Sequence, residues 1–184
     1  MARRSVRPAA SYSRTGTTMR ATENFRRQHR ELSRDAMDLL SKLEPARIGQ
    51  HAESLRRDLS RFVGKLRVHA AMEQDALYPR LLADPEAPIR DKARQLLAEV
   101  GELYEEVFRF SERWASPSTL RADPQRFQDE TQELLRRLGA RMIRENSELY
   151  PLVDAAHAQS GAAPGVIDVA GSLDPDATPA QPSR

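Results

Sequence analysis

Four stretches of this sequence repeat apolar residues at alternating three- and four-residue steps. That spacing places apolar side chains along one face of an α-helix, the face that a helix buries against its neighbours. The stripes run from Phe25 to Leu43, from Leu55 to Leu77, from Ile89 to Trp114 and from Phe127 to Leu152. No alternating pattern of strand type competes with them. The sequence therefore predicts an all-α protein with four long helices.

Prolines mark where these helices are expected to begin and end. Pro45 ends the first helix, because proline disfavours helical backbone at the residue before it. The third helix opens at Asp84-Pro85 or near Pro88, and the fourth opens at Asp123-Pro124. Since the connections are short, consecutive helices are expected to be antiparallel, which predicts an up-and-down four-helix bundle.

The length fits one folded domain, which we place at residues 21–157. Residues 1–20 carry arginine without acidic residues and lack the apolar core of a secretory signal, so we expect a disordered basic arm. The alternatives for this arm are a nucleic-acid contact, a transit-like sequence, or translation that starts at Met19. Residues 158–184 are rich in Ala, Pro, Gly and Ser and predict a disordered tail. We expect a cytoplasmic protein.

The composition excludes several classes of function. No run of 18 apolar residues exists and 30% of residues are charged, so no membrane-spanning helix is expected. Cysteine is absent, which removes thiolate metal sites and iron–sulfur clusters, and leaves His, carboxylates and water as metal ligands. No Gly-rich phosphate loop or Ser-His-Asp arrangement supports a nucleotide-binding protein or a hydrolase. The chain has 26 arginines and three lysines, and acidic residues are interspersed with them through its middle, which indicates composition bias and not nucleic-acid binding.

Five polar residues interrupt the apolar stripes at positions where leucine is expected: His29, His69, Glu73, Arg141 and Glu145. Each can bind a cation or carry a charge. Burying such groups is costly unless they are paired or bound to a metal. Their positions therefore predict a polar site inside the helical core.

The second and fourth helices share an internal repeat. In both, a Glu lies four positions after a basic residue, and a Leu-Tyr-Pro sequence begins four positions after that Glu. The first copy is His69, Glu73 and Leu77-Tyr78-Pro79, and the second is Arg141, Glu145 and Leu149-Tyr150-Pro151. A His and a Glu four residues apart lie on one helix face and can bind one ion. Each proline is expected to end or kink its helix at a similar distance from the site.

With these motifs the chain resembles the hemerythrin-like HHE cation-binding family, over about residues 21–154. The segment QHREL at residues 28–32 and the His69 repeat carry the resemblance. It implies a bundle around a di-iron centre, held by a His on helix one, HxxxE on helix two, a His on helix three and HxxxE on helix four. The chain departs from that pattern twice, with Glu99-Val100 in place of Glu-His and with Arg141 in place of the last His.

Carried onto this chain, the resemblance implies that His29 and His69 hold the first metal, while Glu73 and Glu145 remain from the former bridges. These four residues suit one iron(II), manganese(II) or zinc ion. Arg141 then places a fixed positive charge where the second metal would lie. Two alternatives stay open. One is a metal-free ion cluster, in which Arg141 and one protonated His neutralise both carboxylates; the other is a di-metal site completed by other ligands.

The leading hypothesis is a metal-binding protein that handles or senses iron, oxygen, peroxide or nitric oxide, with a small diatomic molecule or peroxide as its ligand. Reversible dioxygen carriage is disfavoured, because in the family it uses two irons. Binding is favoured over catalysis, which stays open; neither a membrane nor nucleic acid is expected as a partner. The competing hypothesis is a metal-free helical interaction or regulatory module that has lost the di-iron centre.

Other polar residues of the chain have simpler roles than metal binding. Tyr78 and Tyr150 are interpreted as caps of the bundle end, with hydrogen-bond donation to a carboxylate as the alternative. A surface position or a solvated helix face is expected for the remaining candidates: His51, His157, Glu102, Glu105 and Glu106.

Overall fold

The computed structural model describes residues 22–100 and 103–159, apart from the side chains of residues 99 and 100. All regular structure in these residues is helical, which confirms the all-α prediction. The predicted arm at 1–20 and residues 160–184 of the predicted tail lie outside the described residues, whereas residues 158 and 159, which the prediction placed in that tail, belong to the last helix. In chain order the elements are α1 (Glu23–Leu40), α2 (Pro45–Met72), the π-helical turn η1 (Glu73–Leu77), α3 (Tyr78–Leu82), α4 (Ala87–Val100), α5 (Leu103–Arg113), α6 (Pro117–Ala122), α7 (Pro124–Arg144), the π-helical turn η2 (Glu145–Leu149) and α8 (Tyr150–Gln159).

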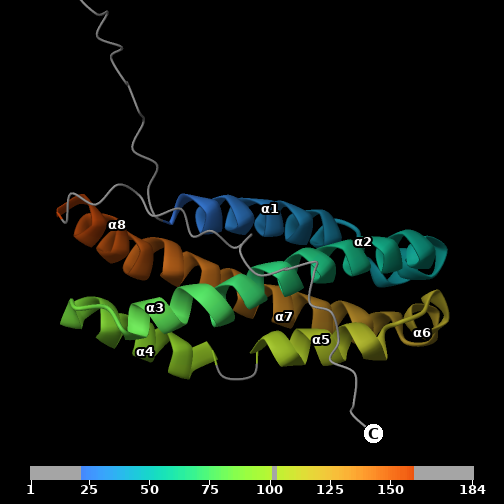
Figure 1. Ribbon diagram of the computed structural model, residues 1–184. Helices are drawn as coiled ribbons and strands as arrows, with labels where there is room; N and C mark the ends of the chain where they lie inside the picture. The colour runs from blue at the N-terminus through green and yellow to red at the C-terminus, as the bar shows by residue number, and fades with distance from the viewer. Residues whose placement is uncertain (1–21, 101–102, 160–184) are drawn as a thin grey trace, which may run out of the picture.

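Long helical segments lie side by side in the molecule (Figure 1). α2 continues through η1 into α3, and α7 continues through η2 into α8. α1 packs against α2 and α7, α5 packs against the same two helices, and α4 packs against α3 and α8. No helix among the described residues is long and apolar enough to cross a membrane.

The predicted apolar stripes form the core, in two clusters along the helices. In α1, Leu32 belongs to the first cluster and Phe25 to the second. In the segment from α2 to η1, Leu66 belongs to the first cluster and Leu77 to the second. The polar residues of the stripes lie between these positions in each helix, so a buried polar layer separates two apolar ones.

Pro45 has a different role from the one predicted. α1 already ends at Leu40, and Pro45 is the first residue of α2. A proline at the first helical position loses no hydrogen bond, because the N–H groups of the first turn have no partner within the helix. Leu43 lies in the connection between the helices, yet it is buried in the core.

The short helix α6 was not predicted. Ser116 caps it by accepting a hydrogen bond from the backbone N–H of Thr119 at 3.3 Å, and Pro117 follows at the first position. This Ser-Pro pair was the sequence signal for a helix start. Leu120 is fully buried, and α6 packs against α2, so the helix closes one end of the core.

The predicted start of the fourth helix is confirmed: α7 begins at Pro124, and Asp123 Oδ1 accepts a hydrogen bond from Arg126 N at 3.1 Å. We expect Asp123→Ala to lower the free energy of unfolding by about 1 kcal/mol, because the cap acceptor is lost. Asp123→Asn keeps a side-chain acceptor and should retain most of the stability that the cap provides. Urea denaturation followed by circular dichroism measures both; an unchanged midpoint for the alanine variant would contradict the cap.

Neither helix ends at the proline of its repeat, although an end or a kink was expected there. A π-helical turn begins at Glu73 and another at Glu145, so that Tyr78 N donates to Glu73 O and Tyr150 N to Glu145 O, five residues back. Each proline then falls at the second position of the helix that follows, where no donor is required. The repeat in sequence is therefore also a repeat in backbone structure, with both wide turns starting at the buried glutamates.

Candidate metal centre

The structure brings together four side chains that can bind a metal ion. His29 comes from α1, His69 from α2, Glu73 from η1 and Glu145 from η2. All four are at most 2% exposed. One ligand atom from each lies within 4.8 Å of the others. These are the four residues that the sequence pointed to.

Four of the six distances between these ligand atoms are those expected around one metal ion. His29 Nε2 lies 3.1 Å from His69 Nε2, 3.5 Å from Glu145 Oε2 and 3.8 Å from Glu73 Oε1. His69 Nε2 lies 3.3 Å from Glu73 Oε1. Ligand atoms about 2.0–2.2 Å from a metal are about 3–4 Å apart from each other. Each of these four distances falls in that range.

The outer nitrogen of each imidazole is held by a neutral side-chain amide. His69 Nδ1 bonds to Gln28 Oε1 at 2.9 Å, and His29 Nδ1 bonds to Asn146 Oδ1 at 3.2 Å. An amide oxygen only accepts, so both Nδ1 atoms donate. When the rings are neutral, both Nε2 atoms therefore carry lone pairs that face the centre. This is the tautomer that metal-binding histidines adopt.

Arg141 contacts the other side of both carboxylates. Its Nη2 lies 3.1 Å from Glu73 Oε2 and 2.9 Å from Glu145 Oε1. The side chain is only 5% exposed. The guanidinium thus contacts the glutamate oxygens that do not approach the histidines. Arg141 pairs both within its own helical segment and across to η1, so it carries the positive charge expected beside the two carboxylates.

The tyrosine of each repeat donates a hydrogen bond to the glutamate of the other repeat. Tyr78 O–H donates to Glu145 Oε1 at 2.8 Å, and Tyr150 O–H donates to Glu73 Oε1 at 3.3 Å. Each repeat therefore supports the carboxylate of the other. The interpretation of both tyrosines as bundle-end caps is wrong, and the alternative, donation to a carboxylate, is confirmed.

Tyr104 on α5 is a site residue that the sequence reasoning missed. Its hydroxyl donates to Glu73 Oε2 at 2.6 Å, and the residue is 4% exposed. The signal was present, because Tyr104 lies four residues after Val100 and three before Val107, the spacing of the same apolar stripe. A tyrosine on a buried stripe requires a partner for its hydroxyl.

Burial and neighbouring groups shift the pKa values of the two glutamates in opposite directions. Burial, together with the nearby Glu73 carboxylate, raises the pKa of Glu145 to about 8. Burial also acts to raise the pKa of Glu73, but His29 and His69, when they carry a proton on Nε2, and the charge of Arg141 bring it well below its usual range. Glu145 Oε2 has no hydrogen-bond partner although it is buried. An acceptor left in this state calls for a cation or a proton beside it.

The remaining candidates lie away from the centre. His51 and His157 are exposed, as is Glu105, which agrees with the surface positions expected. Glu106 is half-buried and pairs with Arg137. Glu102 and the side chains of Glu99 and Val100 lie outside the described residues, so the departure predicted on the third helix has no structural description.

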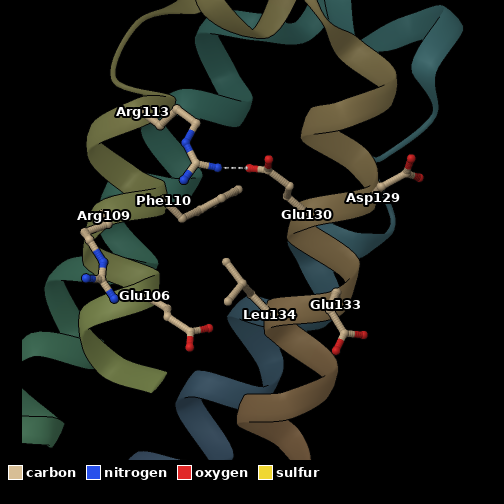
Figure 2. A pocket seen from close by; sticks show the side chains of 8 residues that line it. All are labelled: Glu106, Arg109, Phe110, Arg113, Asp129, Glu130, Glu133 and Leu134. Carbon is tan, nitrogen blue, oxygen red and sulfur yellow. Dashed lines mark hydrogen bonds and ion pairs between the residues drawn. The ribbon is translucent and has the colours of Figure 1, made fainter. Parts of the chain in front are cut away.

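A large hollow of about 550 Å³ lies between α5 and α7 (Figure 2). It contains no residue of the candidate metal centre. Four acidic side chains and two arginines line it, and Arg113 Nη1 bonds to Glu130 Oε2 across it at 2.7 Å. The chemistry-bearing residues therefore lie inside the core and not in this hollow.

Comparison with protein families gives one result. The model of the hemerythrin HHE cation binding domain matches residues 20–153. That range includes every residue of the candidate centre and confirms the resemblance that the motifs indicated. No curated protein and no solved structure gave a match.

Proposed function

This chain belongs to the hemerythrin HHE cation-binding domain family, and from that premise we propose that it binds a single metal ion through His29, His69, Glu73 and Glu145. Iron(II) is the ion we propose, with manganese(II) and zinc as the other metals that suit two imidazoles and two carboxylates. The protein would act in the cytoplasm, where it handles or senses oxygen, peroxide or nitric oxide. We also propose that its long helices form an up-and-down antiparallel four-helix bundle.

The observation that supports this function best is the pair of facing imidazole nitrogens. His29 Nε2 and His69 Nε2 lie 3.1 Å apart, and the amide oxygens of Asn146 and Gln28 hold the protons on the opposite nitrogens. Two buried lone pairs at this distance repel each other unless a positive charge lies between them. A metal ion provides that charge, and the unpartnered Glu145 Oε2 completes its surroundings.

Arg141 supports one ion and not two. Its Nη2 contacts Glu73 Oε2 and Glu145 Oε1, which also accept hydrogen bonds from Tyr104 and Tyr78, so the oxygens that a second ion would need are already occupied. A guanidinium stays charged at every physiological pH, so this positive charge is permanent. The guanidinium therefore takes the place of the second metal ion. The other oxygen of each carboxylate, Glu73 Oε1 and Glu145 Oε2, faces the proposed metal position.

The surrounding side chains orient the ligands and exclude water. The ring of Tyr150 stacks on His29 at 5.6 Å between centroids, and the ring of Phe25 lies edge-on to His69 at 6.4 Å. Tyr78 and Tyr104 fix the carboxylates through their hydroxyl groups. When bound here, iron(II) would supply redox chemistry and affinity for a small oxidant or diatomic ligand. The apolar layers on both sides keep bulk water from that position.

Metal content tests this proposal directly. The full chain, purified without an affinity tag, is analysed for metal before and after anaerobic reconstitution with Fe(II). We expect about one equivalent per chain, by the coordination argument above. Glu73→Ala should abolish binding, whereas Glu148→Ala, which removes a half-buried glutamate of η2 that pairs with Lys92, should retain it. Two equivalents would contradict the single-ion site.

One observation favours a second candidate, a metal-free interaction or regulatory module. Arg141 already spans both carboxylates, and a proton between His29 and His69 would complete the charge balance without a metal. No bound metal after reconstitution would support this candidate over the first.

A further inference from the structure

A second pocket, of about 210 Å³, lies between α4, α5 and α7. We call it the arginine pocket, because its described lining combines four arginines with three apolar residues and has no acidic residue. The lining residues are Leu96, Leu103, Arg136, Arg137, Ala140, Arg141 and Arg144. Each of the four arginines also pairs with a carboxylate that lies outside this lining, so what the pocket offers a ligand is the remaining donors of these arginines.

Arg141 joins this pocket to the metal centre. Its Nη2 serves Glu73 and Glu145, but Nε and Nη1 are buried and have no hydrogen-bond partner in the described part of the chain. The rings of Tyr104 and Tyr78 flank the guanidinium, with Cζ 5.0 Å and 5.6 Å from their centroids, and so restrict its orientation. Buried donors without partners are rare in folded proteins. Here they belong to a side chain that lines the arginine pocket.

Acidic partners hold two other arginines in place from the outside. Arg136 bonds to Glu133 through Nε and Nη2, and Arg137 bonds to Glu106. Both glutamates line the neighbouring hollow of Figure 2 and not the arginine pocket. The ion pairs thus divide the surface into an acidic and a basic hollow. They position the arginines without placing a carboxylate among the described residues that line the pocket.

We propose that the arginine pocket binds a small oxyanion, with Arg141 as its buried anchor and Arg136 and Arg137 as its outer contacts. The planar fork of arginine matches the oxygens of phosphate and carboxylate groups and forms charge-assisted hydrogen bonds with them. The volume of about 210 Å³ is below the roughly 300–1,000 Å³ typical of pockets for larger ligands. This site is separate from the metal centre and does not require a metal.

Titration with inorganic phosphate tests the proposal. Metal-free full-length protein is titrated by calorimetry at constant ionic strength, balanced with chloride. We expect saturable binding of about one phosphate per chain, and at least about a tenfold loss of affinity in the double variant Arg136→Gln/Arg137→Gln, because two charged donors are removed. Arg126→Gln removes the same kind of charge from α7 outside the pocket and should change the affinity by less than about twofold.

A spectroscopic measurement keeps the test independent of these variants. In ¹⁵N-labelled protein, the Nε–H resonance of Arg141 should shift as phosphate saturates, and that of Arg126 should not. The proposal is overturned if phosphate binding does not saturate, if Arg126→Gln weakens it as much as the double variant does, or if the Arg141 signal does not respond. Because no metal is present, these outcomes do not depend on the metal-binding proposal.

Discussion

Replacing Arg141 with methionine is expected to lower the free energy of unfolding of the metal-free protein by about 3–5 kcal/mol. Arg141 is the guanidinium that contacts both Glu73 and Glu145 inside the core. Its removal leaves the Glu73 carboxylate, whose pKa is well below its usual range, buried without its permanently charged partner. Methionine fills similar space, so the loss reports the charge and not a cavity. Urea denaturation at neutral pH with a chelator present measures it.

Arg137→Met is the matched control for this variant. Arg137 lies one turn earlier on α7, and its side chain is 38% exposed in its pair with Glu106. An exposed ion pair contributes about 0–1 kcal/mol, so the control should be close to wild type. If Arg141→Met costs no more than the control, Arg141 does not stabilise the buried carboxylates in the way described.

Replacing His29 with leucine should abolish the stabilisation that a metal gives to the protein. A ligand at 100 times its dissociation constant raises the free energy of unfolding by about 2.7 kcal/mol, which corresponds to a rise in Tm of about 5–10 °C for a chain of this length. We expect this rise in the wild type on addition of Fe(II) or Mn(II). His29→Leu removes one of the four converging ligand atoms and should show none. Thermal melts with and without metal measure both.

In the metal-free protein, His29→Leu is expected to change the free energy of unfolding only through the hydrogen bond that His29 makes. His29 bonds to Asn146, so leucine leaves the Asn146 amide oxygen without its donor. That loss is expected to cost about 1–3 kcal/mol in the metal-free protein. His51→Leu changes an exposed histidine on α2 and should keep the full metal-dependent rise. A large metal-dependent rise in His29→Leu would contradict the proposed site, and no rise in the wild type would favour the metal-free module.

Much of the fold could be predicted because it depends on local spacing. Apolar residues three and four positions apart specify a helix with one buried face, and this pattern is visible within a single segment. The same reasoning locates His29, His69, Glu73, Arg141 and Glu145 inside the core, since a residue on the buried stripe is buried whatever its chemistry. The repeat of His69 and Glu73 in Arg141 and Glu145 is likewise a property of the sequence alone.

Errors arose where two readings of one local signal were both compatible with the sequence. Pro45 is compatible with the end of one helix and with the start of the next, and only the observed end of α1 at Leu40 decides between them. Pro79 and Pro151 would break an α-helix, but a π-helical turn before each lets the helix continue. A change in backbone hydrogen bonding from four residues to five leaves no clear mark on the side-chain pattern.

The sequence by itself determined the long apolar stripes, their helical character and the identity of the polar residues on their buried faces. Only the tertiary structure decided which of these residues meet: that Arg141 contacts both glutamates, that Tyr78 and Tyr150 exchange partners, and that Tyr104 joins them. The same holds for the arginine pocket, which three helices form together. The reason is that contacts across helices depend on the rotation and axial shift of one helix against another. The packing of the whole core sets both quantities, and no single segment contains them.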